Sequence, residues 1–108
     1  MPQLVFTGVK EKDLKIINKD LTDQLSKITG TQRDGFSFKL DESKYMFDGE
    51  IVSPFTLIDI YWFERPRAMQ DACAKAITEK LSAVGYEDVE VVFHMLYPDC
   101  YYVDGEHL

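Results

Sequence analysis

The chain has 108 residues, of which 45% are hydrophobic and 29% charged, a balance typical of one folded domain spanning residues 1–108 and unlike a disordered segment. Nineteen acidic residues against 12 basic ones give a formal net charge of −7, which argues against nucleic-acid and anionic-membrane partners. Because no apolar stretch approaches the roughly 20 residues of a membrane span and the start lacks a secretion-signal pattern, we expect a cytoplasmic protein in which Cys73 and Cys100 are reduced.

The first half of the chain predicts a strand, a helix and a second strand. A short apolar run over residues 3–7 is typical of a strand. Apolar residues then recur at spacings of three and four from Leu14 to Ile28, which predicts an amphipathic helix that ends at Gly30. Over residues 36–42, phenylalanine and leucine alternate with polar residues, as in a strand with one buried face.

The second half repeats this order after an irregular insertion. The insertion contains a predicted turn at Asp48-Gly49 with short extended pieces on either side. The β-branched and aromatic run at 56–64 predicts a central strand covered on both faces. A second amphipathic helix is expected between Pro66 and Gly85, followed by a strand over 89–96 and a polar-aromatic tail with another Asp-Gly turn.

These elements form two βαβ units in series. Strands joined by a helix run parallel and cross over right-handed, so we expect an α+β fold with one mixed sheet of four or more strands and both helices on one face. The strands at 56–64 and 89–96 are apolar on both sides. We therefore expect identical chains to cover the other face of the sheet.

The start of the chain, Met1-Pro2, has two interpretations. Proline is acceptable as the first residue of a strand and has no further role there. Alternatively, removal of the methionine leaves Pro2 with a free secondary amine. A start of Met-Pro-x-apolar-x-apolar followed by two βαβ units resembles the tautomerase superfamily, which includes 4-oxalocrotonate tautomerase, 5-carboxymethyl-2-hydroxymuconate isomerase and macrophage migration inhibitory factor (MIF). The segments MPQLVF, RDGFSF, WFERPRAMQD and YYVDGEHL are similar to an uncharacterised single-domain branch of it.

The resemblance implies a tautomerase or isomerase in which the Pro2 amine is the general base. Its substrate would be a small enol or 2-hydroxy-dienoate carboxylic acid, with no cofactor. The resemblance also implies a homotrimer with the second sheet face in a central core and a pocket at each subunit boundary. An α-amino group titrates near ~7.7–8.0, and apolar burial or nearby cations lower that value toward the range in which a base removes a proton next to a carbonyl.

Such an enzyme needs cations that hold a carboxylate and a developing enolate. The candidates are Lys10, Arg33 and Arg65, which otherwise are ordinary solvated surface cations. Lys10 and Arg33 rank first because the superfamily places its substrate-binding cations in those regions. Trp62 is a candidate wall of an apolar pocket or a core residue, and His94 packs on its strand or lines the mouth of the pocket.

Several positions depart from the superfamily's substrate-binding set. Gly30-Thr31 stands where MIF has Gly-Lys, Ser37 aligns with an arginine of 4-oxalocrotonate tautomerase, and Glu90 and Val92 align with the tyrosine and asparagine near the MIF pocket. Two alternatives therefore stay open. One is a catalytically silent trimer that binds a small ligand or a protein, and the other is a ferredoxin-like interaction domain in which Pro2 is incidental.

Other chemistry-bearing motifs are weak. His94, Cys100 and His107, with Asp99 or Glu106, match no zinc-ligand spacing, so no metal is expected. The sequence also lacks a phosphate loop, a dinucleotide fingerprint and a G-x-S-x-G motif.

Overall fold

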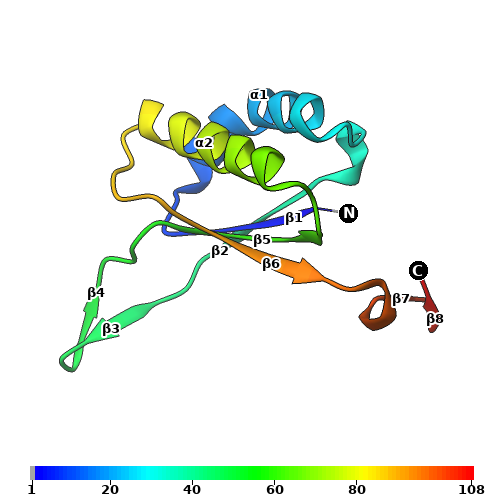
Figure 1. Ribbon diagram of the computed structural model, residues 1–108. Coiled ribbons are helices and arrows are strands. Elements are labelled where there is room, and N and C mark those ends of the chain that lie inside the picture. Colours follow the sequence, from blue (N-terminus) through cyan, green and yellow to red (C-terminus); the bar gives the residue numbers. More distant parts are fainter. Residues whose placement is uncertain (1) are drawn as a thin grey trace.

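The computed structural model describes residues 2–108 and shows a four-stranded sheet with two helices on one face (Figure 1). The strand order is β2-β1-β5-β6. β1 is parallel to β2, β5 is parallel to β6, and β1 is antiparallel to β5, so the sheet is mixed. This arrangement confirms the predicted α+β fold with two βαβ units. The bounds are β1 (Gln3–Thr7), α1 (Glu11–Thr29), β2 (Ser37–Asp41), β5 (Leu57–Phe63), α2 (Arg67–Ala83) and β6 (Glu90–Leu96).

Two short hairpins extend from this body. β3 (Tyr45–Phe47) pairs antiparallel with β4 (Glu50–Val52), and this hairpin projects away from the sheet (Figure 1). Its turn residues Asp48 and Gly49 have φ of 55° and 80°, as two-residue hairpin turns require. β7 (Tyr102–Val103) and β8 (Glu106–His107) form the second hairpin. Both predicted Asp-Gly turns are therefore confirmed.

The core lies between the helices and the sheet. Alternate residues of β1 and β5 point toward the helices, which explains why their neighbours in the sequence are less buried. The helices contribute the residues that recur at spacings of three and four. The buried apolar side chains include Leu4, Phe6, Leu14, Ile17, Leu21, Leu25, Ile58, Ile60, Trp62, Cys73, Ile77 and Leu81. Among residues 2–108, neither helix has the length and apolarity that a bilayer crossing requires.

The sheet face away from the helices, here called the open face, is more polar than expected. Its central rows contain Lys39, Asp59 and His94, and His94 Nε2 lies 2.7 Å from Asp59 Oδ1. The His94 ring stacks on Tyr61 with 4.3 Å between centroids. The prediction that the strands at 56–64 and 89–96 are apolar on both sides therefore fails on this face at Asp59, His94 and the end residue Glu90, while the other residues of β5 and β6 on it are Leu57, Tyr61, Phe63, Val92 and Leu96. Asp59 is tolerated within an apolar run because the imidazole of His94, its diagonal neighbour on β6, supplies its hydrogen bond.

Helix α1 begins without a side-chain hydrogen bond from its N-cap residue. Lys10 occupies the N-cap position and makes no side-chain cap. Its backbone N–H donates to the Tyr86 hydroxyl over 2.8 Å, and that hydroxyl donates to Asp13 Oδ2 over 2.6 Å. Burial, followed by the hydrogen bond to Asp13, raises the pKa of Tyr86 and so keeps the hydroxyl protonated as a donor. Tyr86 thus bridges the two positions that a capping box joins directly.

Substitution of Tyr86 with phenylalanine is expected to lower the free energy of unfolding by about 1–2 kcal/mol, because two hydrogen bonds at the helix start are lost. Urea denaturation at neutral pH measures this change. Tyr45 is the matched control, since its ring packs on Phe55 and its hydroxyl has no hydrogen-bond partner among the described residues. Tyr45→Phe is expected to change stability by less than about 0.5 kcal/mol. Equal effects of the two substitutions would contradict a capping role for Tyr86.

Candidate functional site

Pro2 lies at the start of β1 with its ring inside the core. Its carbonyl accepts a hydrogen bond from the Ser37 N–H over 3.1 Å. Its side chain is less than 2% exposed and lines an apolar cavity of about 10 Å³. That volume is close to the minimum for one water molecule, so the cavity has no room for an organic ligand. The other lining residues are Leu4, Leu25, Phe36, Ile60, Trp62, Cys73 and Ile77.

Arg65 lies next to this cavity, on the ring of Trp62. Its guanidinium carbon is 4.7 Å from the centroid of the Trp62 ring, in a cation–π contact. Nη1 donates to the Phe63 carbonyl over 3.1 Å and Nη2 to Thr31 Oγ1 over 3.2 Å. Partial burial lowers the pKa of Arg65. Among residues 2–108, no carboxylate forms an ion pair with it, so this cation is available to an anion.

A groove opens at the same edge of the sheet. The carboxyl ends of the parallel strands β5 and β6 meet there. Since β1 is antiparallel to β5, Pro2, which precedes β1, lies at that end of the sheet as well. Phe63, whose carbonyl accepts a hydrogen bond from Arg65, lines this groove. The volume is about 380 Å³, large enough for a small organic acid. The lining residues are Phe63, Glu64, Met95, Leu96, Tyr97 and Pro98.

The two cations ranked first from the sequence lie elsewhere or are already paired. Arg33 Nε is 2.5 Å from Asp23 Oδ1, and Arg33 Nη2 also donates to the Lys19 carbonyl over 3.4 Å. Lys10 follows β1, so a five-residue strand, roughly 16 Å long, separates it from Pro2. Within one chain, Arg65 is the candidate cation that combines proximity to the Pro2 cavity with a guanidinium free of acidic partners.

The remaining candidates divide between the two faces of the sheet. Trp62 is 1% exposed and lines the Pro2 cavity, so it is a core residue and a cavity wall at once. Its Nε1 has no hydrogen-bond partner among the described residues. His94 lies on the open face, paired with Asp59, and does not line the cavity. Phe36 and Cys73, which the sequence interpretation left out, complete the cavity wall.

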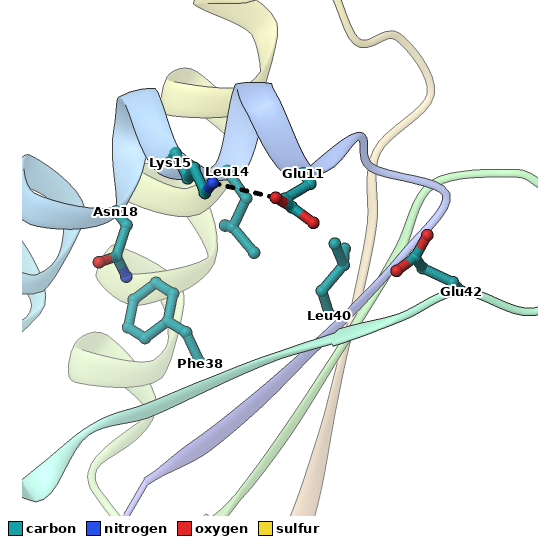
Figure 2. A pocket seen from close by; sticks show the side chains of 7 residues that line it. All are labelled: Glu11, Leu14, Lys15, Asn18, Phe38, Leu40 and Glu42. Atoms are coloured by element: carbon teal, nitrogen blue, oxygen red, sulfur yellow. Dashed lines mark ion pairs between the residues drawn. The ribbon is translucent and has the colours of Figure 1, made fainter.

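A second groove lies between α1 and the edge strand β2, with a volume of about 330 Å³ (Figure 2). Leu14, Phe38 and Leu40 give it apolar walls, and the Glu11–Lys15 ion pair of 3.0 Å lies beside it. Asn18 and Glu42 complete the lining. None of the candidate residues from the sequence lines this groove, and it contains no unpaired cation.

The cysteines and histidines of residues 2–108 form no metal-binding cluster. No group of three His, Cys, Asp or Glu side chains in this range is arranged to hold a metal ion. His107 Nε2 lies 3.1 Å from the Asp99 carbonyl oxygen. Cys73 is buried, Cys100 is exposed, and both are free thiols.

The fold is that of the tautomerase superfamily. A MIF-like protein from Entamoeba histolytica superposes with a TM-score of 0.75 at 19% identity, and the match covers 99% of this chain and 98% of that one. A fused 4-OT, described as a wild-type asymmetric trimer, gives a TM-score of 0.78 at 14% identity over 97% of this chain and 94% of that one. At such identities the likeness concerns the fold alone.

A much closer likeness leads to the family. No curated protein matches this sequence significantly. The crystal structure of a Domain of unknown function (DUF1904) from Sebaldella termitidis superposes with a TM-score of 0.91 at 29% identity, and the match covers 100% of both chains. The family model described as "Domain of unknown function (DUF1904)" matches residues 1–107. The chain therefore belongs to the DUF1904 family, whose fold here is that of the tautomerases.

Proposed function

We propose that the protein is a tautomerase or isomerase in which the Pro2 amine, freed by removal of the initiator methionine, is the general base. The substrate is a small enol or 2-hydroxy-dienoate carboxylic acid. The observation that carries this proposal is the Arg65 guanidinium, which is partly buried, free of acidic partners and stacked on the Trp62 wall of the Pro2 cavity. An unpaired cation at that position suits a substrate carboxylate.

The reaction is a proton transfer between oxygen and carbon. The neutral Pro2 amine removes the proton of the substrate's enol hydroxyl, and the oxygen electron pair forms the carbonyl. The carbon–carbon double bond shifts, and the protonated amine returns the proton to the carbon that gains electron density. Arg65 holds the carboxylate and stabilises the negative charge on the enolate. The apolar surroundings of the Pro2 ring and the Arg65 cation both disfavour a protonated amine, so we expect a pKa below the ordinary ~7.7–8.0.

The proposal includes a homotrimer. Among residues 2–108, 11 large hydrophobic side chains are exposed, of which five lie between Met46 and Phe55 and four between Tyr97 and Leu108. These clusters belong to the two hairpin segments, and such clusters mark protein contacts. Lys10 reaches a Pro2 site only from a neighbouring copy, because within one chain Lys10 and Pro2 lie at opposite ends of β1. The trimeric fused 4-OT, which shares this fold, agrees with this assembly.

The alternative is a catalytically silent trimer that binds a small carboxylate. The Pro2 cavity favours this alternative, because its volume of about 10 Å³ leaves no room for a substrate behind the proline ring. In such a protein Arg65 binds an anion, but the Pro2 amine has no raised reactivity toward electrophiles.

Reaction with 3-bromopyruvate distinguishes the two functions. We expect a single adduct on Pro2, located by intact mass and peptide mapping, with a rate that rises with pH as the amine loses its proton. The apparent pKa should lie below ~7.7. Cys73 should stay unlabelled near neutral pH, since burial raises its pKa to about 11. A Cys100→Ser variant removes the exposed competing thiol. If Cys100 alone is labelled in the unmodified protein, the amine is not activated and the binding function is the better account.

A further inference from the structure

Thr31 joins two loops at the Pro2 end of the sheet. Its hydroxyl Oγ1 accepts a hydrogen bond from Arg65 Nη2 over 3.2 Å, across 34 positions of the sequence. Thr31 follows α1 and Arg65 lies between β5 and α2, so this bond links the two βαβ units. The other hydrogen bond of the guanidinium goes to the Phe63 carbonyl, two residues away. Within residues 2–108, Thr31 therefore provides the one hydrogen bond that ties Arg65 to a distant part of the chain.

The backbone of Thr31 is held on both sides. Its carbonyl accepts a hydrogen bond from Ser26 Oγ over 2.6 Å, and its N–H donates to Thr29 Oγ1 over 3.2 Å. Both partners belong to the end of α1, which terminates at Gly30 in the left-handed conformation typical of a helix C-cap. With the backbone fixed, the direction of the Thr31 hydroxyl depends on one torsion angle, χ1.

Gly35 restricts that torsion angle. A Cβ atom on Gly35 would lie 2.9 Å from Thr31 Cγ2, which is closer than two carbon atoms pack without a shift. The methyl group of Thr31 thus occupies space that any side chain at residue 35 would need. Because the methyl and the hydroxyl share Cβ, they turn together. The methyl beside Gly35 therefore goes with a hydroxyl directed at Arg65.

We propose that Thr31 is a positioning residue, which holds the Arg65 guanidinium in the orientation that binds the substrate carboxylate. This inference rests on the proposed function, because it concerns the same cation. The bonds to Phe63 and Thr31 fix the guanidinium at two nitrogens, and the Trp62 ring supports its face. A planar fork fixed in this way binds a carboxylate through its other N–H donors with little loss of side-chain freedom.

Thr31→Val removes the hydroxyl and keeps the branched shape of the side chain. We expect Pro2 labelling by 3-bromopyruvate to slow by about 3–10-fold. The pH profile should keep its midpoint, because the Arg65 charge remains. Thr31→Ser retains the hydroxyl and should bring the rate back to within about 2-fold of the wild-type rate. Thr78→Val is the matched control, since the Thr78 hydroxyl donates to the Ala74 carbonyl over 2.8 Å within α2, and it should leave the rate unchanged.

Trp62 supplies a readout that depends on no reaction. It is the one tryptophan of the chain, and the Arg65 guanidinium carbon lies 4.7 Å from the centroid of its ring. Because indole emission responds to a charge near the ring, movement of Arg65 changes the fluorescence spectrum. We expect Thr31→Val to shift the emission maximum, and Thr31→Ser and Thr78→Val to leave it in place. A merely structural role of Thr31 would lower the free energy of unfolding without altering the emission of the folded protein.

Gly35→Ala acts on the same hydroxyl from another residue. Gly35 ends the 3₁₀ turn Arg33–Gly35, whose backbone conformation also suits alanine. The added methyl displaces the Thr31 methyl and turns the hydroxyl away from Arg65, so both readouts should change as they do in Thr31→Val. In the double variant that combines Gly35→Ala with Thr31→Ser, the colliding methyl of residue 31 is absent. We expect this double variant to recover the labelling rate and the emission maximum, and circular dichroism checks the fold of each variant.

The two readouts separate the possible failures. Unchanged Trp62 emission in Thr31→Val overturns the positioning role, whatever happens to the rate, because Thr31 then does not act through Arg65. Shifted emission with an unchanged labelling rate also overturns it, since the orientation of the guanidinium then has no effect at the site. If the wild-type protein is not labelled at Pro2, the proposed function fails, and the emission of Thr31→Val and Gly35→Ala still decides whether Thr31 holds Arg65 in place.

Discussion

Replacement of Met46 and Phe47 with serine is expected to dissociate the proposed trimer into folded monomers. Both side chains are 72% exposed in the single chain, on a hairpin with three residues in each strand that projects from the sheet (Figure 1). A two-stranded hairpin of this kind is marginal in water unless its apolar side packs on something. Loss of a buried anchor at an interface costs about 2 kcal/mol, or roughly 30-fold in affinity, so the double variant should weaken association by up to ~1000-fold.

Sedimentation velocity over a range of protein concentrations measures this change, and circular dichroism confirms that the monomer stays folded. Ile16→Ser is the matched control, because Ile16 is 66% exposed on α1 and lies outside both hairpins. It should leave the assembly unchanged. A wild-type protein that is monomeric at every concentration, or a double variant that stays trimeric, would contradict the proposed role of the hairpin.

Elements set by local periodicity could be predicted from the sequence. The spacing of apolar residues from Leu14 to Ile28 gave α1 to within a few residues, because one helical face must be buried against the sheet. Asp48-Gly49 gave the first hairpin, because both residues tolerate positive φ. The parallel pairs β1–β2 and β5–β6 followed from the helix that connects each pair, whereas the antiparallel β1–β5 pair between the two units does not follow from that rule.

Features that depend on distant partners could not be predicted in this way. Asp59 is one polar residue in an apolar run, and its partner His94 is 35 positions away, so the sequence pattern suggested a face more apolar than the real one. Arg33 and Arg65 look alike in sequence as loop cations. Only the three-dimensional arrangement shows that Arg33 is paired with Asp23 and that Arg65 is free. Tyr86 likewise caps a helix that begins 75 residues earlier, counting from Glu11.

Substitution of Arg65 with glutamine is expected to slow the labelling of Pro2 by 3-bromopyruvate by about 10–100-fold at neutral pH. A hydrogen-bonded contact with a charged group contributes about 1.5–3 kcal/mol, and each 1.4 kcal/mol is a factor of ten. The pH profile should move as well. Loss of a nearby cation makes the protonated amine more favourable, so the apparent pKa of the amine should rise and the labelling should need a higher pH.

Arg67→Gln is the matched control, because it removes the same charge two residues further on, from an exposed side chain at the start of α2. If the net charge alone matters, both variants lower the rate equally, and the effect shrinks as salt screens it. If Arg65 holds the carboxylate, only its own substitution lowers the rate, and Arg65→Lys restores the pH profile but not the full rate, because an ammonium group lacks the planar fork. An Arg65→Gln variant with the wild-type rate and pH profile would remove the observation on which the proposed function rests, since the free guanidinium would then serve only the packing of Trp62.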